Sequence, residues 1–217
     1  MVDSAQARRA MVDGQVRPHD VTDLRIIAAL LEVPRELFFP PTQRALAYLD
    51  AEVPVAGTRV QLKPMVFAKL LQAAEIAEND RVLDVGCATG YSSAVLGKLA
   101  GGVVALEEDA ALARKASETL AQLGLANASV ATGQLTAGWP QAAPYDAILI
   151  EGAVEVVPDA LVAQLKDGGR LVAVVGSVPM GKATLYRRIG SHVTALPLFD
   201  AAAPLLPGFA KPPAFVF

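Results

Sequence analysis

Apolar residues recur at two different spacings along the chain, and these spacings predict where helices give way to alternating strands and helices. In residues 4–16 and again in residues 26–31, apolar side chains lie three or four positions apart, as on one buried face of a helix. Residues 42–63 follow neither period, apart from a short strand-like run at Val53–Ala56. We therefore expect residues 1–63 to form a helical extension packed on the core.

Beyond the extension, short apolar runs typical of buried strands alternate with segments of helical period. This alternation favours a parallel sheet covered on both faces. Two later segments, 183–189 and 193–199, indicate a closing hairpin of edge strands, followed by a proline-rich loop. The predicted fold for residues 64–217 is a doubly wound, mostly parallel, seven-stranded α/β sheet. Its other strands are expected at 81–85, 103–106, 128–131, 145–150 and 170–175, with helices at 65–74, 91–99, 109–123 and 157–165.

The turn after the first predicted strand of the sheet is the most informative segment. Gly86 lets the backbone turn tightly, and Gly90 permits the next helix to start close to the strand. The small residues Cys87 and Ala88 allow a ligand to approach the main chain, whose amides are expected to be free to bind it, as at a helix N-terminus. Asp84, inside the strand, is expected to face the ammonium group of a cofactor or to orient the turn.

An acidic pair closes the next predicted strand. Glu107, with Glu108 after it, lies 21 positions beyond Gly86, a spacing that suits a carboxylate accepting hydrogen bonds from ribose hydroxyls. The glycine turn is shorter than the G-x-G-x-x-G pattern of dinucleotide sites, and an acid precedes it. Both features favour S-adenosylmethionine as the cofactor.

With these residues the sequence resembles the S-adenosylmethionine-dependent methyltransferases and, more narrowly, the protein-L-isoaspartate O-methyltransferase family. The resemblance implies a repair enzyme that methylates the α-carboxylate of isoaspartyl residues in aged peptides or proteins. A carboxylate with a pKa of about 4 is already ionised at neutral pH, so this chemistry needs no general base. The resemblance covers residues 11–16, 21–25, 33–38, 47–50, 63–66, 82–91, 138–140, 144–146, 157–158 and 165–171.

The resemblance also points to the candidate catalytic positions. When the chain is aligned on Pro64, Leu62 stands at the position of the family's active-site serine, beside Lys63. Glu151 ends the fourth strand on the methyl-acceptor side, where the family has a small neutral or hydroxyl residue. Glu151 could serve as the base for a hydroxyl or amine acceptor, or simply face solvent or pair with a cation such as Lys63. Loss of the serine also leaves open a catalytically inactive, cofactor-binding module.

The adenine side of the predicted site falls after the third strand. There the family usually has an aspartate between two glycines, which accepts a hydrogen bond from the adenine amino group. This chain has Gln134 between Gly133 and Leu135. The amide oxygen of glutamine can accept the same hydrogen bond without a charge.

Charge and composition exclude several other classes of protein. The net charge is −3 and the isoelectric point about 5.4, with no basic cluster, so we expect no nucleic-acid partner. One cysteine and two distant histidines, His19 and His192, predict no metal site. Residues 1–9 lack the apolar core of a secretory signal, no apolar stretch could span a membrane, and a single thiol suits a reducing compartment. We therefore expect a cytoplasmic protein without a membrane partner.

Overall fold

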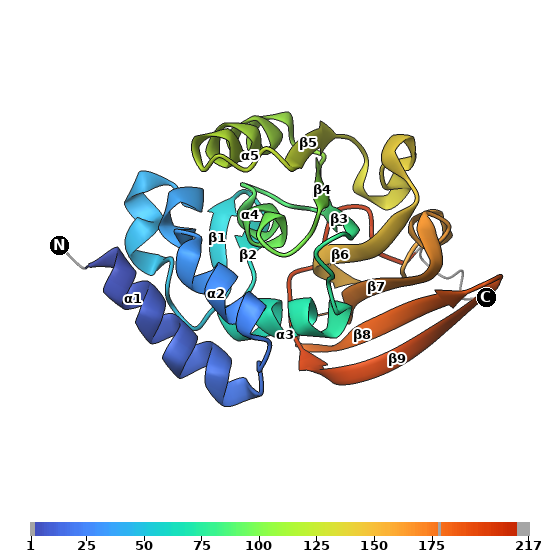
Figure 1. Cartoon of the computed structure of the whole chain (residues 1–217), viewed down its shortest axis with the longest axis horizontal. Helices are drawn as coiled ribbons and strands as arrows, with labels where there is room; N and C mark the ends of the chain where they lie inside the picture. The colour runs from blue at the N-terminus through green and yellow to red at the C-terminus, as the bar shows by residue number, and fades with distance from the viewer. Residues whose placement is uncertain (1–2, 178, 212–217) are drawn as a thin grey trace, which may run out of the picture.

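The computed structural model describes residues 3–177 and 179–211, and in that part of the chain a seven-stranded sheet carries helices on both faces (Figure 1). The strand order is β5-β4-β3-β6-β7-β8-β9, with the first five parallel and the last two antiparallel. This is the predicted doubly wound α/β fold. The main elements are α3 (Pro64–Ala74), β3 (Arg81–Val85), α4 (Tyr91–Gly97), β4 (Gly102–Glu107), α5 (Ala110–Gln122), β5 (Ala128–Thr132), β6 (Tyr145–Val154), α6 (Asp159–Val162), β7 (Leu165–Ser177), β8 (Met180–Ile189) and β9 (His192–Ala201).

Two helices open the extension, as predicted. Helix α1 (Ser4–Met11) and helix α2 (Leu24–Glu32) are capped by Asp3 and Asp23, whose carboxylates accept from the amides of Ala5 and Arg25 at 2.9 and 2.8 Å. Such side-chain caps satisfy amides that the helix itself leaves unpaired. The structure bears out helices in these two segments, whereas the division of the chain at residue 63 stays a prediction.

A β-hairpin follows the helices, and the sequence pattern predicted only half of it. Strand β1 (Val53–Ala56) was expected, but its antiparallel partner β2 (Arg59–Gln61) lies in a segment read as irregular. The reason is that β2 turns polar side chains inward, with Arg59 and Gln61 buried. The apolar-in, polar-out alternation that marks a half-buried strand is therefore absent.

Side chains on alternate positions of the central strands enter two separate cores. Val82 and Val172 lie on the face covered by α3 and α4, in one cluster with Ile26 of the extension. Leu83 and Leu171 face the opposite side, which is covered by α6 and by the loop after β9. In Figure 1 the extension lies on one side of the molecule and β8–β9 on the other. No helix in the described part of the chain is both long and apolar enough to cross a membrane.

Two sequence expectations need correction near the end of the chain. The helix expected at 157–165 shrinks to α6, because Leu165 already pairs with Tyr145 in the sheet. Strand β8 is not an edge strand, since it pairs with both β7 and β9. The sequence pattern does not reveal sheet order, so a strand paired on both sides can resemble an edge strand.

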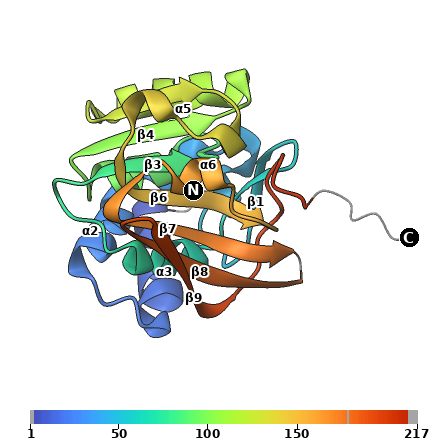
Figure 2. The same ribbon diagram turned by 90° about the vertical axis from the view of Figure 1, so that its right-hand side faces the viewer.

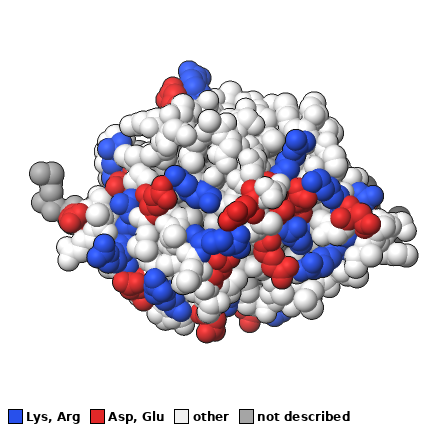
Figure 3. Space-filling model, viewed as in Figure 1, with Lys and Arg blue, Asp and Glu red and all other residues white. Residues whose placement is uncertain are grey.

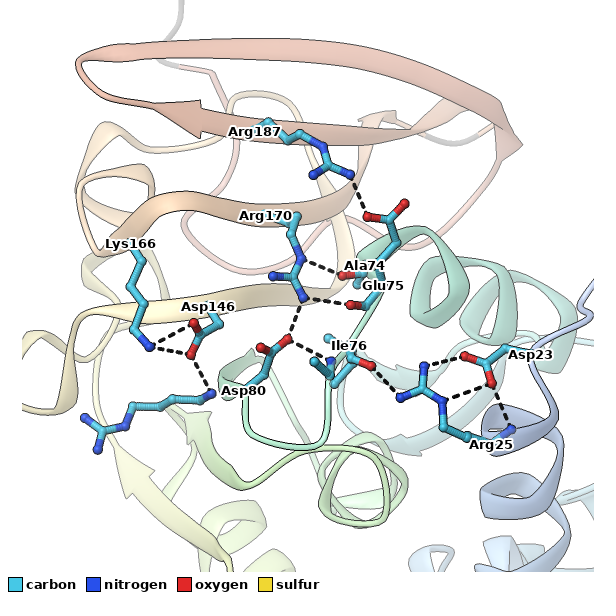
Figure 4. Close-up of polar contacts among 12 residues, drawn as sticks. Asp23, Arg25, Ala74, Glu75, Ile76, Asp80, Asp146, Lys166, Arg170 and Arg187 are labelled. Atoms are coloured by element: carbon cyan, nitrogen blue, oxygen red, sulfur yellow. Dashed lines mark hydrogen bonds and ion pairs between the residues drawn. The ribbon is translucent and has the colours of Figure 1, made fainter.

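The end of helix α3 is tied to the sheet by Arg170 (Figure 4). Its guanidinium donates to the carbonyls of Ala74 and Glu75, both at 2.8 Å, and pairs with Asp80 at 2.5 Å. The last carbonyls of a helix lack partners within the helix, and a basic side chain can satisfy them. Since β3 begins directly after Asp80, this junction positions the strand that carries the candidate site.

The sheet reverses its strand order at β3. From β3 the chain moves outward to β4 and β5, then returns to place β6 on the other side of β3. Ligands of open α/β sheets bind at the carboxyl ends of the strands beside such a switch point. Figure 2 shows the C-terminal loop and β1 lying where β6 ends. The loop is held there by Leu206, whose amide donates to the carbonyl of Ala153 at 2.9 Å.

Candidate active site

The carboxyl end of β3 places Asp84 against the first turn of helix α4. Its side chain is completely buried, and Oδ2 accepts from the hydroxyls of Ser92 at 2.7 Å and Ser93 at 2.5 Å. Its Oδ1 is also buried and has no donor within the described residues. Asp84 therefore holds the start of α4 and keeps one oxygen that a ligand could bind.

The glycine turn adopts the left-handed backbone that its small residues allow. Gly86 and Gly90 have φ angles of 81° and 92°, and Ala88 adopts 50° without being glycine. The amides of Gly86 and Cys87 donate to the carbonyl of Leu106 at 2.8 and 3.2 Å, and the amide of Gly90 donates to the carbonyl of Cys87 at 2.8 Å. The expectation that these three amides are free for a ligand is therefore wrong.

Glu107 ends strand β4 directly beside this turn, with a fully buried side chain. Its Oε2 accepts from the amide of Ala88 at 2.8 Å and from Nη2 of Arg59 at 2.5 Å. Its Oε1 accepts from the amides of Glu108 and Asp109 at 3.0 and 3.2 Å. The structure thus joins the two halves of the predicted cofactor signature, and protein donors surround the carboxylate.

Hairpin β1–β2 brings two further polar side chains to the turn, and sequence analysis missed both as site residues. Arg59 is 8% exposed and Gln61 6% exposed, so neither is a surface side chain. The amide nitrogen of Gln61 lies 3.4 Å from Oγ1 of Thr89, in the glycine turn. The signal that could have identified them is the period of two in an extended segment, which places residues 59 and 61 on the same face.

The residues next to β2 are fixed by another buried arginine. Arg35 donates to the carbonyl of Leu62 at 2.8 Å, and its guanidinium lies 4.6 Å from the ring centroid of Tyr91. The side chain of Leu62 belongs to the main apolar core and lines the small cavity described below. Lys63 pairs with Asp50 at 3.2 Å, so the pairing of Lys63 with Glu151 considered above is wrong.

Beneath the hairpin lies a cavity of about 20 Å³, with Cys87 and Ala88 of the glycine turn in its wall. A single water needs roughly 10–15 Å³. Three polar atoms of residues in this wall are buried without partners among the described residues, namely Oε1 of Gln61, the hydroxyl of Tyr91 and Oε1 of Glu151. Buried polar groups normally find partners, so their convergence here indicates a site built for a polar ligand.

Glu151, in strand β6, is the acid among the residues that line this cavity. Burial raises the pKa of the Glu151 carboxyl well above its ordinary value. The nearby charge of Asp84 adds to this rise, while Arg35 and Arg59 oppose it. This shift favours the protonated, neutral form of Glu151 more than in an exposed glutamate.

The predicted adenine side lies next to Glu107. The amide of Gly133 donates to the carbonyl of Glu107 at 3.0 Å, which brings the ends of β4 and β5 together. The side chains of Gln134 and Glu108 are exposed at this edge, whereas Leu135 is buried in the second core. Gln134 and Glu108 can reach a ligand from the rim, and Leu135 can contribute only through its backbone or by packing.

Burial also raises the pKa of Asp84, to about 6, against the opposing hydrogen bonds from Ser93 and Ser92. The unfolded chain releases this proton near pH 4, so the stabilisation from protonated Asp84 is full below about pH 4 and is lost as the pH rises through 6. A difference of about two pKa units corresponds to about 3 kcal/mol.

Asp84→Asn is therefore expected to flatten the pH dependence of stability, because asparagine has no carboxyl group that titrates. Between about pH 4 and pH 8, the free energy of unfolding should fall by about 2–3 kcal/mol more in the wild type than in the variant. Urea unfolding at both pH values measures the difference. Parallel curves for the two proteins would contradict the buried, titrating carboxylate.

A larger hollow, of about 780 Å³, lies away from these residues, where β8 and β9 meet the end of β7. Its charged lining residues, Lys182 and Asp200, pair with each other at 2.5 Å. Across residues 3–177 and 179–211, no cluster of three or more His, Cys, Asp or Glu side chains could hold a metal ion. The cavity below the hairpin therefore remains the candidate site.

Comparison with known proteins assigns the family. The profile of the family described as protein-L-isoaspartate(D-aspartate) O-methyltransferase (PCMT) matches residues 6–195. The chain belongs to the PCMT family. A protein-L-isoaspartate O-methyltransferase of Rhodopseudomonas palustris is 44% identical over 201 residues, covering 88% of this chain and 92% of that protein. One of Methanoregula boonei is 39% identical over 185 residues, covering 85% of both.

Solved structures agree with this PCMT fold. A protein-L-isoaspartate O-methyltransferase superposes with a TM-score of 0.81 at 23% identity, over 95% of this chain and 66% of that one. A putative family member from Plasmodium falciparum, solved with S-adenosyl-L-homocysteine, gives 0.78 at 17% identity, over 95% and 99%. The family resemblance and the fold class predicted from the sequence are both confirmed.

Proposed function

We propose that this PCMT-family chain is an S-adenosylmethionine-dependent methyltransferase that methylates the carboxylate of isoaspartyl residues in peptides or proteins. The observation that carries the proposal is the bond from the Ala88 amide to Glu107, because it joins the glycine turn to the acid. Relatives that are 39–44% identical bear the name of this activity.

The residues present suit the chemistry of the cofactor. The unpaired Oδ1 of Asp84 can accept from an ammonium group, and Glu107 can accept from ribose hydroxyls. The small turn residues Gly86, Cys87, Ala88 and Gly90, which let a ligand approach the main chain, and Glu108, Gly133, Gln134 and Leu135 at the ends of β4 and β5 complete the proposed set. The cofactor supplies an electrophilic methyl group on a sulfonium.

The proposed acceptor needs positioning rather than activation. A carboxylate with a pKa of about 4 attacks as it stands, so the protein contributes proximity and a site from which water is excluded. Leu62 and Tyr91 form part of the cavity wall, and Lys63, which pairs with Asp50, follows Leu62 in the chain. Burial raises the pKa of Glu151, which favours its neutral form, and in that form Glu151 does not repel the incoming carboxylate and can donate a hydrogen bond to it.

Incubation with methyl-labelled cofactor and an isoaspartyl peptide tests the proposal. We expect label in a base-labile methyl ester on the isoaspartyl peptide, and none on the same peptide with ordinary aspartate. Only the isoaspartyl form places a main-chain α-carboxylate in a side-chain position. Equal labelling of both peptides, or labelling of neither, would contradict the proposal.

The buried, unpaired Oε1 of Glu151 also favours a second candidate, a hydroxyl or amine acceptor with Glu151 as base. Glu151→Gln in the same assay separates the two. Gln is a neutral analogue of protonated Glu, so carboxylate methylation should survive in the variant, whereas a base-dependent reaction should stop. If calorimetry shows binding of S-adenosylhomocysteine but no acceptor is methylated, the chain is an inactive cofactor-binding module.

We further propose a cytoplasmic protein without nucleic-acid partners. The one cysteine, Cys87, is buried as a free thiol, which suits a reducing compartment. On the face seen in Figure 3, basic and acidic side chains are interspersed rather than gathered into a basic patch.

A further inference from the structure

Arg59 is bound to the carboxylate that the cofactor would need. Its Nη2 lies 2.5 Å from Oε2 of Glu107, and both side chains are buried, at 8% and 0% exposure. The two residues are 48 positions apart in the sequence, so only the fold brings them together. Because this ion pair is close and buried, it belongs to the candidate site rather than to the protein surface.

The carboxylate of Glu107 has no acceptor position left. Two oxygens offer about four lone-pair directions. The amides of Ala88, Glu108 and Asp109 fill three, and Arg59 fills the fourth. The three amides belong to fixed backbone, whereas Arg59 sits on a side chain. A ribose hydroxyl can therefore bind Glu107 only where Arg59 now binds.

Arg59, together with Leu206, also fills the space above the glycine turn. A Cβ atom placed on Gly86 would lie 3.0 Å from Nη2 of Arg59 and 3.3 Å from a methyl group of Leu206. The remaining cavity of about 20 Å³ is far below the roughly 300–1,000 Å³ of sites for ligands of this size. The described conformation is closed to a nucleoside.

Apart from its ion pair with Glu107, the side chain of Arg59 has few polar contacts. Its Nε and Nη1 are buried without acceptors in the described part of the chain. Arg59 belongs to the short hairpin β1–β2, which turns at Gly57, where φ is 51°. The neighbouring Gln61 reaches Thr89 only at 3.4 Å and leaves its Oε1 unpaired. Few polar contacts therefore resist withdrawal of the hairpin's inner face.

We propose that Arg59 is an internal occupant of the cofactor site, held on Glu107 where the ribose hydroxyls would bind, and that hairpin β1–β2 must withdraw it before the cofactor can enter. This inference rests on the proposed function, since it concerns access to the same site. If Arg59 must leave first, the affinity for the cofactor depends on the equilibrium between the closed and open conformations of the hairpin.

Calorimetric titration of S-adenosylhomocysteine into Arg59→Met tests the competition. Met retains an apolar stem and removes the charge, while three amides still hold Glu107. If a small fraction of the wild type is open, apparent affinity is reduced by that fraction, so the variant should bind at least about tenfold more tightly. Arg59→Lys, which keeps a cation opposite Glu107, is the matched control and should stay close to the wild type.

Hydrogen exchange on the unmodified chain provides a second measurement that does not depend on a variant folding. Saturating S-adenosylhomocysteine should speed exchange of the hairpin amides at 53–61, because the hairpin opens, and slow exchange of the turn at 86–90. Hairpin amides that stay as protected as in the free protein would overturn the proposal.

The titration outcomes separate this inference from the proposed function. Tighter binding by Arg59→Met, with Arg59→Lys unchanged, supports the competition. Equal affinity of the wild type and Arg59→Met overturns the competition alone and leaves the methyltransferase intact. Absence of binding by both proteins overturns the proposed function and this inference together.

Discussion

Glu107→Gln is expected to lower the free energy of unfolding by about 3–5 kcal/mol and to abolish binding of S-adenosylhomocysteine, because it leaves Arg59 as a buried charge without a partner. Gln also has one oxygen where Glu107 has two, so its NH₂ group would face backbone donors. Urea unfolding and calorimetric titration measure the two effects. Wild-type stability in the variant would show that the ion pair is not buried as described.

A double variant controls for the orphaned charge. In Glu107→Gln combined with Arg59→Met, no buried cation remains, so most of the lost stability should return. Binding should not return, because the carboxylate for the ribose is still missing. If stability stays as low as in the single variant, the loss arises from the backbone around Glu107 rather than from Arg59.

Gly90→Ala is the second substitution with a large expected effect. Gly90 has φ 92°, and a Cβ atom there would lie 3.0 Å from Cβ and 3.2 Å from Cα of Ala116 in helix α5. Backbone strain of about 1–3 kcal/mol and overpacking of about 1–3 kcal/mol should together cost about 2–6 kcal/mol. Because Gly90 starts helix α4, affinity for S-adenosylhomocysteine should fall as well.

Gly124→Ala is the matched control for backbone strain alone. Gly124 has φ 69°, and a Cβ atom there would have no neighbour within 4 Å. Its substitution should cost about 1–2 kcal/mol without changing cofactor affinity. Equal losses from both substitutions in urea unfolding would mean that contact with Ala116 contributes nothing.

Together these substitutions test how the closed site is held. Among residues 3–177 and 179–211, the side chain of Arg59 has one partner and that of Glu107 has four, so removing the arginine should destabilise the fold less than removing the acid. An entering ligand can then replace Arg59 at Glu107, because Arg59 is held by few contacts while Glu107 stays fixed by three backbone amides.

The sequence predicted the main domain well because its elements are locally encoded. Strands β3 and β4 contain short apolar runs, and the helices that follow them have a clear period. The glycine turn and Glu107 were found for a similar reason, since their spacing follows from one strand, one helix and the next strand. Elements whose pattern is local can be read without knowing their neighbours.

Other features depend on contacts between distant segments. Strand β2 was missed because its inward residues are polar, and α6 is short because Leu165 joins the sheet. The amides of the turn were expected to be free, but the carbonyl of Leu106 takes two of them. Each case turns on a partner that lies outside the segment itself.

The sequence alone therefore determined the family, the α/β sheet and the place of the glycine turn and its acid, since period and spacing along the chain encode them. Only the tertiary structure decided that Arg59 lies on Glu107, that Oε1 of Glu151 is buried and that Leu206 packs against the turn. The physical reason is that burial and ion pairing depend on which surfaces meet in space, and sequence separation carries no such information.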